Sequence, residues 1–251
     1  MHRNNPAIIV MAKAPRPADV KTRLRPVLSD LDCAELSKCF LLDAVAKASQ
    51  MSVTVIVAFT PTGSGDQIEE LLSERFTYIA QRGDDLGERL ESAISDAQNQ
   101  GFGPIVVIGT DSPTVPANYL DLALDYLLAK ENGIVIGPSE DGGYYLIGVS
   151  TYHEQLFRRI SWSTDRVFEQ TIANAKRISG MSISQLPSWY DIDEPDDLFR
   201  LREEMESDER ARANAPATFR WLAANTPGWT TQSNASGMRA SSHQRTDERH
   251  G

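Results

Sequence analysis

Residues 105–113 read IVVIGTDSP, four β-branched residues and a glycine followed at once by an acidic turn. A strand with one face in water would alternate apolar and polar residues. This run does not alternate, so it predicts a strand buried on both faces. Similar runs stand at 7–12, 53–59 and 134–137, and helical patterns fall between them. The sequence therefore predicts a doubly wound, mostly parallel α/β sheet flanked by helices.

Seven strands and six longer helices are predicted along the chain. The strands are expected near 7–12, 53–59, 76–80, 105–109, 134–137, 144–149 and 181–186. The helices are expected near 31–49, 66–73, 86–100, 116–130, 164–178 and 195–206, with a short amphipathic helix over 216–224. Ser29 and Asp32 form a plausible capping pair for the first helix.

Composition sets the class of protein. The 251 residues are 41% hydrophobic and 24% charged, and the formal net charge is −10. An acidic surface argues against nucleic-acid and anionic-membrane partners. With apolar runs of only about eight residues, far below the ~20 of a membrane span, we expect a cytoplasmic protein. We expect one domain over 6–224. The stretch 225–251 is expected to be a disordered tail, since 226–251 holds no Val, Ile, Leu, Phe or Tyr.

Several chemistries lack the residues they need. Cys33 and Cys39 lie six positions apart on one predicted helix, which argues against a disulfide or a cysteine metal site. Only His153 lies away from the chain ends, so a histidine-centred triad or a multi-histidine zinc site has almost no residues from which to form. Lys21-Thr22 resembles the end of a P-loop, but the glycines of that motif are missing.

Polar clusters follow five of the predicted strands. They are KAPRPADVKTRL (13–24), QRGDDLGERL (81–90), TDSP (110–113), PSEDGGYY (138–145) and WYDIDEPDDL (189–198). In an open parallel sheet, ligands bind beyond the carboxyl ends of the strands. The five clusters therefore predict a single ligand site along one edge of the sheet.

The first cluster is cationic and the third is acidic. Lys13, Arg16, Lys21 and Arg23 fall within eleven residues, a set suited to di- or triphosphate oxygens, although a solvated basic loop explains them equally well. Asp111 directly follows a buried strand, where it is either a turn residue or a ligand of a hard divalent cation. Asp191 and Asp193 would complete such a site for Mg²⁺ or Mn²⁺, the alternative being acids that begin a helix.

The remaining clusters permit binding roles beside structural ones. Gln81, Gly83 and Gly87 could read a nucleobase edge, or the glycines could simply serve a loop that enters a helix. Asp141-Gly142-Gly143 ahead of Tyr144 is either a hairpin turn or a place where backbone approaches a ligand. Trp162 and Ser163 precede a predicted helix, and a capped helix start is their simpler interpretation.

Six motifs in order carry a family resemblance over about residues 6–206. They are AKAPRPADVKTRL, GDDLGERL, GTDSP, GPSEDGGYYLIG, WST and DIDEPDDL. This set resembles a bacterial family of glycosyltransferase-like (GT-A type) transferases associated with radical-SAM/selenodomain proteins, some labelled arsenosugar-biosynthesis glycosyltransferases. It is distantly similar to 2-phospho-lactate guanylyltransferase and molybdenum-cofactor guanylyltransferase, which share the nucleotide-diphospho-sugar transferase fold. The family usually carries Gly in the first loop, where this chain has Ala18 or Asp19.

The resemblance implies roles for individual residues. The catalytic set would be Lys21, Arg23, Asp111 and Asp141. The nucleotide side would be formed by Lys13, Ala14, Pro15, Lys21, Arg23, Gln81, Gly83, Gly87 and Thr110. The acceptor side would be formed by Asp141, Gly142, Gly143, Tyr144, Trp162 and Ser163, and the metal ligands would be Asp111, Asp193 and Asp191.

Three functions follow as alternatives. The first is metal-dependent glycosyl transfer from a nucleotide-sugar to a small-molecule acceptor, with Asp141 as general base if the reaction inverts. The second is nucleotidyl transfer, in which a phosphorylated acceptor attacks a nucleoside triphosphate and pyrophosphate leaves. The third is a nucleotide-binding module without catalysis. The expected partners are a nucleotide and a small acceptor, with no nucleic acid and no membrane.

Overall fold

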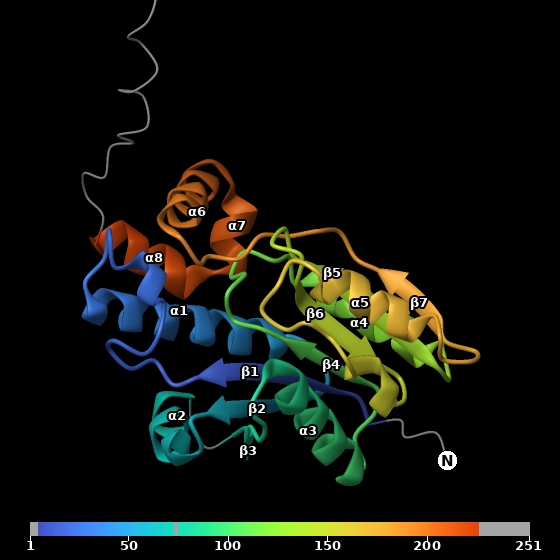
Figure 1. Cartoon of the computed structure of the whole chain (residues 1–251). Helices are drawn as coiled ribbons and strands as arrows, with labels where there is room; N and C mark the ends of the chain where they lie inside the picture. Colours follow the sequence, from blue (N-terminus) through green and yellow to red (C-terminus); the bar gives the residue numbers. More distant parts are fainter. Residues whose placement is uncertain (1–4, 73–74, 226–251) are drawn as a thin grey trace, which may run out of the picture.

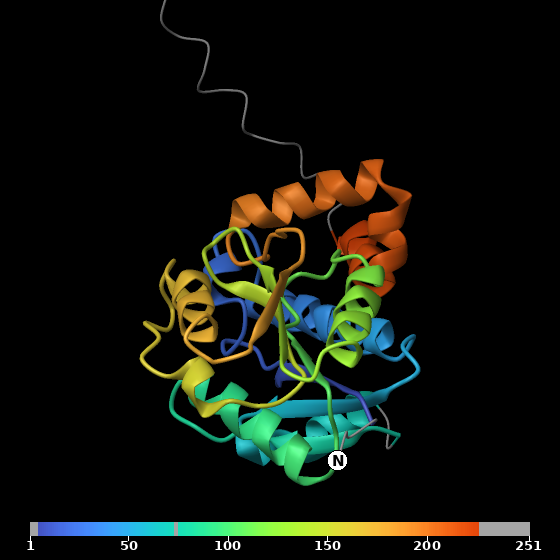
Figure 2. The ribbon, with the colours of Figure 1, turned by 90° about the vertical axis from the view of Figure 1, so that its right-hand side faces the viewer.

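The fold was analysed in a computed structural model, which describes residues 5–72 and 75–225. Seven strands form one sheet in the order β3-β2-β1-β4-β6-β5-β7, with helices on both faces (Figures 1 and 2). The strands are β1 Ala7–Lys13, β2 Thr54–Thr60, β3 Thr77–Ala80, β4 Ile105–Ile108, β5 Gly133–Pro138, β6 Tyr144–Val149 and β7 Ser182–Gln185. The helices are α1 Asp30–Ala48, α2 Gly65–Leu72, α3 Leu86–Asn99, α4 Asn118–Leu128, α5 Val167–Ala175, α6 Pro195–Ser207, α7 Glu209–Asn214 and α8 Pro216–Asn225. Short 3₁₀ turns are η1 Thr22–Leu24, η2 Thr62–Ser64 and η3 Glu154–Phe157.

The predicted α/β class and the predicted strands are confirmed. Strands β1 to β5 and β7 pair in parallel wherever they are neighbours, while β6 runs antiparallel to both β4 and β5. The reason is the short turn over 139–143, which joins β5 to β6 as a hairpin and reverses the chain. The start of β6, rather than its end, therefore lies at the edge where the parallel strands finish.

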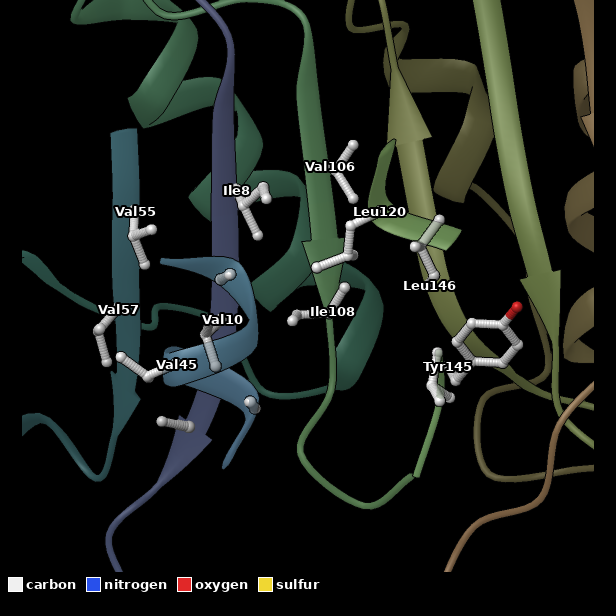
Figure 3. Close-up of a cluster of buried hydrophobic side chains, with 14 of the residues drawn as sticks. Ile8, Val10, Val45, Val55, Val57, Val106, Ile108, Leu120, Tyr145 and Leu146 are labelled. Atoms are coloured by element: carbon white, nitrogen blue, oxygen red, sulfur yellow. The ribbon is translucent and has the colours of Figure 1, made fainter. Parts of the chain in front are cut away.

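Burial on both faces explains the unbroken apolar runs. On β1, Ile8 and Val10 pack toward α1 and α4, while Ala7 and Ile9 pack toward α3. Figure 3 shows the first of these two clusters, with side chains of β1, β2, β4 and β6 meeting those of the covering helices. The central strands thus have no polar face to display in the sequence.

A third apolar cluster joins the two ends of the chain. Leu24 and Phe40 pack with Tyr190, Ile192 and the C-terminal helices α6 to α8. In Figure 1 these three helices gather beside α1. The predicted capping pair is confirmed at the start of α1, where Ser29 and Asp32 form a reciprocal capping box. Helix α7 was not expected from the sequence.

Two remaining expectations are the disordered tail and the absence of a membrane span. The expected disordered tail lies outside the described residues from position 226 onward. Among the described helices, none combines the length and the apolar character needed to cross a membrane.

Candidate functional site

Backbone hydrogen bonds bring three distant segments together at the carboxyl edge of the sheet. Trp189 N–H donates to Pro138 O at 3.0 Å, and Glu140 N–H donates to Trp189 O at 2.9 Å. Three residues after Trp189, Ile192 N–H donates to Asp111 O at 2.9 Å. The stretch 189–192 therefore runs between the β5–β6 turn and the loop after β4, and it carries its acidic residues to Asp111.

Lys21 closes this arrangement from the first loop. Its Nζ lies 2.7 Å from Asp111 Oδ1 and 3.0 Å from Asp193 Oδ1. It also donates to Ile192 O at 2.7 Å. The Lys21 side chain is only 6% exposed, whereas those of Asp111 and Asp193 are 49% and 46% exposed. A buried ammonium thus holds two carboxylates that remain open to solvent.

The charge state of Lys21 follows from these partners. Burial by itself lowers its pKa, but the charges and hydrogen bonds of Asp111 and Asp193 outweigh that effect, and the pKa is raised. Lys21 is therefore a permanent cation at neutral pH.

The acids around it outnumber it. Asp191 accepts a hydrogen bond from the Ser112 hydroxyl. Burial raises the pKa of Asp191 to about 6; the Ser112 bond opposes this rise, and the charges of Asp111, Asp141 and Asp193 add to it. Like charges at this density leave the site with a surplus of negative charge that Lys21 alone does not neutralise.

A cleft of about 370 Å³ opens beside this cluster. Of the predicted site residues, those lining it are Lys13, Lys21, Gln81, Thr110, Asp111, Tyr144 and Asp191. Asp193 joins the group through its ion pair with Lys21. The other predicted site residues are not among those that line the cleft: Ala14, Pro15, Arg23, Gly83, Gly87, Asp141, Gly142, Gly143, Trp162 and Ser163.

Local geometry explains why several of the predicted residues do not line the cleft. Arg23 lies in η1, two residues after Lys21, and its side chain is exposed while Leu24 packs inward. The Asp141 carboxylate accepts from Gly143 N–H at 2.9 Å and from the Ser139 hydroxyl. These bonds close the hairpin turn, which is the structural interpretation of the DGG motif.

Two further glycines serve packing. A Cβ on Gly87 would lie 2.4 Å from the Trp162 ring, so the indole rests directly on the start of α3. Gly83 has φ +130°, a conformation that disfavours other residues. Gln81 donates its amide to Ala58 O at 2.7 Å and to Ala12 O at 3.3 Å. Its NH₂ group is thus used by the sheet, which leaves its carbonyl oxygen for a ligand.

The first loop adopts the left-handed conformation at two non-glycine positions, Ala18 (φ 67°) and Lys21 (φ 48°). The resemblance places a glycine in this loop at the position of Ala18 or Asp19. Each such residue costs of order 1 kcal/mol or more of backbone strain. The loop therefore keeps the turn that glycine would favour, at some cost in stability.

Several cleft residues were not among the predicted site residues, and two of them lie on α3. Arg89 and Leu86 both line the cleft; Arg89 Nε donates to Gly83 O at 3.0 Å, and Leu86 is 47% exposed. Both stand in the quoted cluster 81–90, so an apolar residue that opens a helix beside two acids was the available signal.

Lys47, which does not line the cleft, is another residue that sequence reasoning missed. It is 5% exposed, and its Nζ donates to Pro113 O at 2.9 Å and to Val115 O at 2.5 Å. Burial lowers its pKa to about 8, and the charge of Asp43 opposes that shift. Lys47 thereby anchors the loop that carries Asp111. A lysine within a helix gives no sign of this in the sequence.

The site was tested for a divalent cation. Within the described residues, no three His, Cys, Asp or Glu side chains form a ready metal cage. Mg²⁺ is commonly held by one or two carboxylates together with substrate phosphates, and Asp111 with Asp193 supplies that number. Both carboxylates already share a cation, the Lys21 ammonium. The oxygen donors and the surplus negative charge fit a hard divalent cation.

Comparison with known structures defines the class of fold. A crystal structure from Desulfovibrio desulfuricans G20, provisionally described as a nucleotide-diphospho-sugar transferase, matches with 29% identity and TM-score 0.78, over 89% of this chain and 96% of that one. A cytidylyltransferase from Leptospira borgpetersenii matches with 17% identity and TM-score 0.56, over 88% and 94%. Molybdopterin-guanine dinucleotide biosynthesis protein A from Archaeoglobus fulgidus matches with 13% identity and TM-score 0.52, over 80% and 100%. The fold is that of nucleotide-diphospho-sugar transferases and nucleotidyltransferases.

The family is defined by sequence. Residues 23–164 match the family described as uncharacterized proteins conserved in bacteria, DUF2064, and the chain belongs to it. No curated protein matches the sequence. The matched range includes Asp111 but begins after Lys21 and ends before Asp193, so the cluster around the ammonium draws on residues outside it.

Proposed function

We propose that the protein is a nucleotide-utilising transferase, and that it moves a glycosyl group from a nucleotide-sugar to a small-molecule acceptor. The observation that carries the proposal is the meeting of Lys21, Asp111 and Asp193 beside a cleft at the carboxyl edge of the sheet. Support comes from the 29% identical Desulfovibrio structure, whose description names this class of enzyme.

Phosphate binding is assigned to the cationic side of the cleft. Lys13 and Lys21 line it from the first loop and Arg89 from α3. The Lys21 side chain is already buried, so binding a phosphate there does not require a flexible surface side chain to be ordered. Arg23 is left out of this role since its side chain does not line the cleft.

Metal binding is assigned to Asp111 and Asp193. When bound there, Mg²⁺ or Mn²⁺ would supply Lewis-acid stabilisation of the charge that builds on a departing nucleoside diphosphate. Lys21 and Lys13 would bind the same leaving group from the protein side.

The acceptor side is assigned to Tyr144 and Asp191, which line the cleft. The carboxylate of Asp141, the base expected from the sequence, is engaged in the hairpin turn, whereas Asp191 lines the cleft. We therefore assign proton acceptance from an acceptor hydroxyl to Asp191. The association with radical-SAM proteins and the arsenosugar-biosynthesis label come from the six-motif resemblance and belong to this proposal as its finer part.

Nucleotidyl transfer is the second candidate. Two lysines and an arginine around one cleft suit a triphosphate as well as a sugar diphosphate, and the fold is shared with a cytidylyltransferase. In that reaction an acceptor phosphate attacks the α-phosphorus and pyrophosphate leaves.

One experiment separates the candidates. The protein is incubated with Mg²⁺ or Mn²⁺, with a panel of nucleotide-sugars and nucleoside triphosphates, and with candidate hydroxyl and phosphate acceptors. Release of nucleoside diphosphate from a sugar donor supports glycosyl transfer. Release of pyrophosphate supports the second candidate and contradicts the first. Tight nucleotide binding without turnover across the panel contradicts both and favours a binding module.

A further inference from the structure

Lys21 occupies the place that a cation between Asp111 and Asp193 would take. Its Nζ touches Oδ1 of both carboxylates, at 2.7 Å and 3.0 Å. A divalent cation of the magnesium type binds carboxylate oxygens at about 2.0–2.1 Å. An ion on these same two oxygen atoms would be in direct repulsion with the ammonium, and the low exposure of Lys21 leaves little water to screen the two charges. The metal and Lys21 therefore compete for one pair of oxygens.

Withdrawal of Lys21 into solvent is costly, so without an anion only a high metal concentration forces it. Its side chain is 6% exposed, its ammonium also donates to Ile192 O, and its backbone is fixed in the left-handed region. A buried charge without a partner is strongly unfavourable, so another anion within reach would make it much easier for the ammonium to leave the two carboxylates. The cleft that Lys21 lines is the space in which such an anion can be supplied.

We propose that Lys21 is an exchangeable internal counter-ion, and that a divalent cation displaces it from Asp111 and Asp193 onto the phosphate groups of the incoming donor. This inference rests on the proposed function for the identity of the anion. It names the ligand class as a diphosphate or triphosphate, because a neutral sugar offers the ammonium no replacement for two carboxylates. Metal and polyphosphate would then bind together, and metal alone would bind weakly.

The first test measures Mn²⁺ binding in the absence of any nucleotide. The full chain is titrated with Mn²⁺ and the free ion is followed by electron paramagnetic resonance. Lys21→Met removes the ammonium and keeps most of the side-chain length, so Mn²⁺ should bind at least 10-fold more tightly than to the wild type. Lys21→Arg keeps the charge and should show no such gain. Equal Mn²⁺ affinity in wild type and Lys21→Met would overturn the proposal.

Two controls locate the effect. Lys38→Met removes a partly exposed lysine of α1 that does not line the cleft, and whose ammonium pairs with Glu35 at 3.6 Å. It should leave Mn²⁺ affinity unchanged. Adding Asp111→Asn to Lys21→Met should abolish the gain, since it removes one of the two shared carboxylates. A gain that survives this change would place the metal elsewhere and contradict the exchange.

A second measurement uses the wild-type chain and does not depend on a variant that folds. Amine acetylation by an N-hydroxysuccinimide ester is read by mass spectrometry at Lys21, with buried Lys47 as internal reference. Mn²⁺ at concentrations where resonance shows it bound should raise Lys21 labelling several-fold, and chelation should reverse this. Unchanged labelling with Mn²⁺ bound would overturn the exchange.

Failure of this inference is distinguishable from failure of the proposed function. Both measurements use Mn²⁺ and no donor, so tighter Mn²⁺ binding by Lys21→Met would support the exchange even in a chain that transfers nothing. Conversely, a chain that turns over a nucleotide donor but binds Mn²⁺ equally with and without Lys21 would keep the function and lose the exchange.

Discussion

Two nearly buried lysines bracket the loop after β4, and they illustrate opposite uses of one side chain. Lys21 meets two carboxylates, and its pKa is raised. Lys47 meets two backbone carbonyls, and burial lowers its pKa to about 8. The carboxylates favour the charged form of Lys21. The two carbonyls bind the Lys47 ammonium although burial disfavours its charged form.

The partners decide what each lysine is able to do. Carboxylates that are nearly half exposed can be taken over by another cation, so the contact at Lys21 is exchangeable. The carbonyls of Pro113 and Val115 belong to the backbone and cannot be exchanged without unfolding the loop. A buried lysine therefore indicates a binding site only where its partner groups are accessible to a ligand, as they are at Lys21.

The largest expected effect tests the Lys21 region. Asp111→Asn removes one carboxylate of the proposed metal pair and keeps an oxygen for Lys21. We expect turnover with the active donor to fall about 1000-fold, equivalent to about 4 kcal/mol of transition-state stabilisation, with the free energy of unfolding changed by about 1 kcal/mol or less. Exposed Asp125→Asn is the matched control. Turnover in Asp111→Asn within threefold of wild type would remove this residue from the catalytic set.

The next effect tests the Lys47 region. Lys47→Met leaves two buried carbonyls without a donor, and we expect a loss of about 2–3 kcal/mol in the free energy of unfolding. Chemical denaturation measures it, with exposed Lys130→Met as the reference substitution. If Lys47→Met were as stable as the reference, Lys47 would not be the anchor of the loop.

The pH dependence sharpens the contrast. The folded-state pKa of Lys47, about 8, lies below the ordinary 10.5, so the unfolded chain binds more protons between these values. Stability from this group therefore rises with pH through that window. Between pH 7.5 and 9.5 the wild type should gain about 1–2 kcal/mol relative to Lys47→Met, measured by paired denaturation curves. A constant difference would show that Lys47 titrates normally.

The smallest effect concerns Asp43, the acid whose charge opposes the pKa shift of Lys47. Its carboxylate also accepts from Ala217 N–H at 2.8 Å and from Thr218 N–H at 2.8 Å, at the start of α8. Asp43→Asn removes part of this cap, and we expect a loss of about 1 kcal/mol in the free energy of unfolding. Thermal unfolding beside exposed Asp121→Asn measures it. A loss no larger than in the control would mean that α8 starts without this cap.

Much of the fold was predictable because the buried strands display their environment in sequence. IVVIG at 105–109 and AIIVMA at 7–12 lack alternation, and both are central strands. The grouping of acids after β4 and β7 was predictable from the rule that ligands lie beyond strand ends. The same rule predicts that Asp111 lies near the stretch 189–192, because the loops after β4 and β7 both begin at the carboxyl edge of the sheet.

What escaped prediction depends on distances that no local pattern encodes. Lys21 and Arg23 look equivalent in sequence, yet the side chain of Lys21, just before η1, is buried, and that of Arg23, within η1, is exposed. Tyr144 was expected at the site as part of the cluster after the fifth strand, and it lies at the cleft because β6 is antiparallel and begins there. Lys47 acts through carbonyls 66 and 68 residues away.

The third apolar cluster ties the chemistry to elements that contribute none of it. Leu24, next to the lysine-bearing loop, and Ile192, between two of the acids, share their packing with α6, α7 and α8. Shortening the chain ahead of α6 would strip the scaffold from both, and the acids and the lysine would lose their alignment although every one of them is still encoded. The C-terminal helices thus hold the two segments in position. Substitutions of their buried residues should weaken ligand binding, although these residues do not line the cleft.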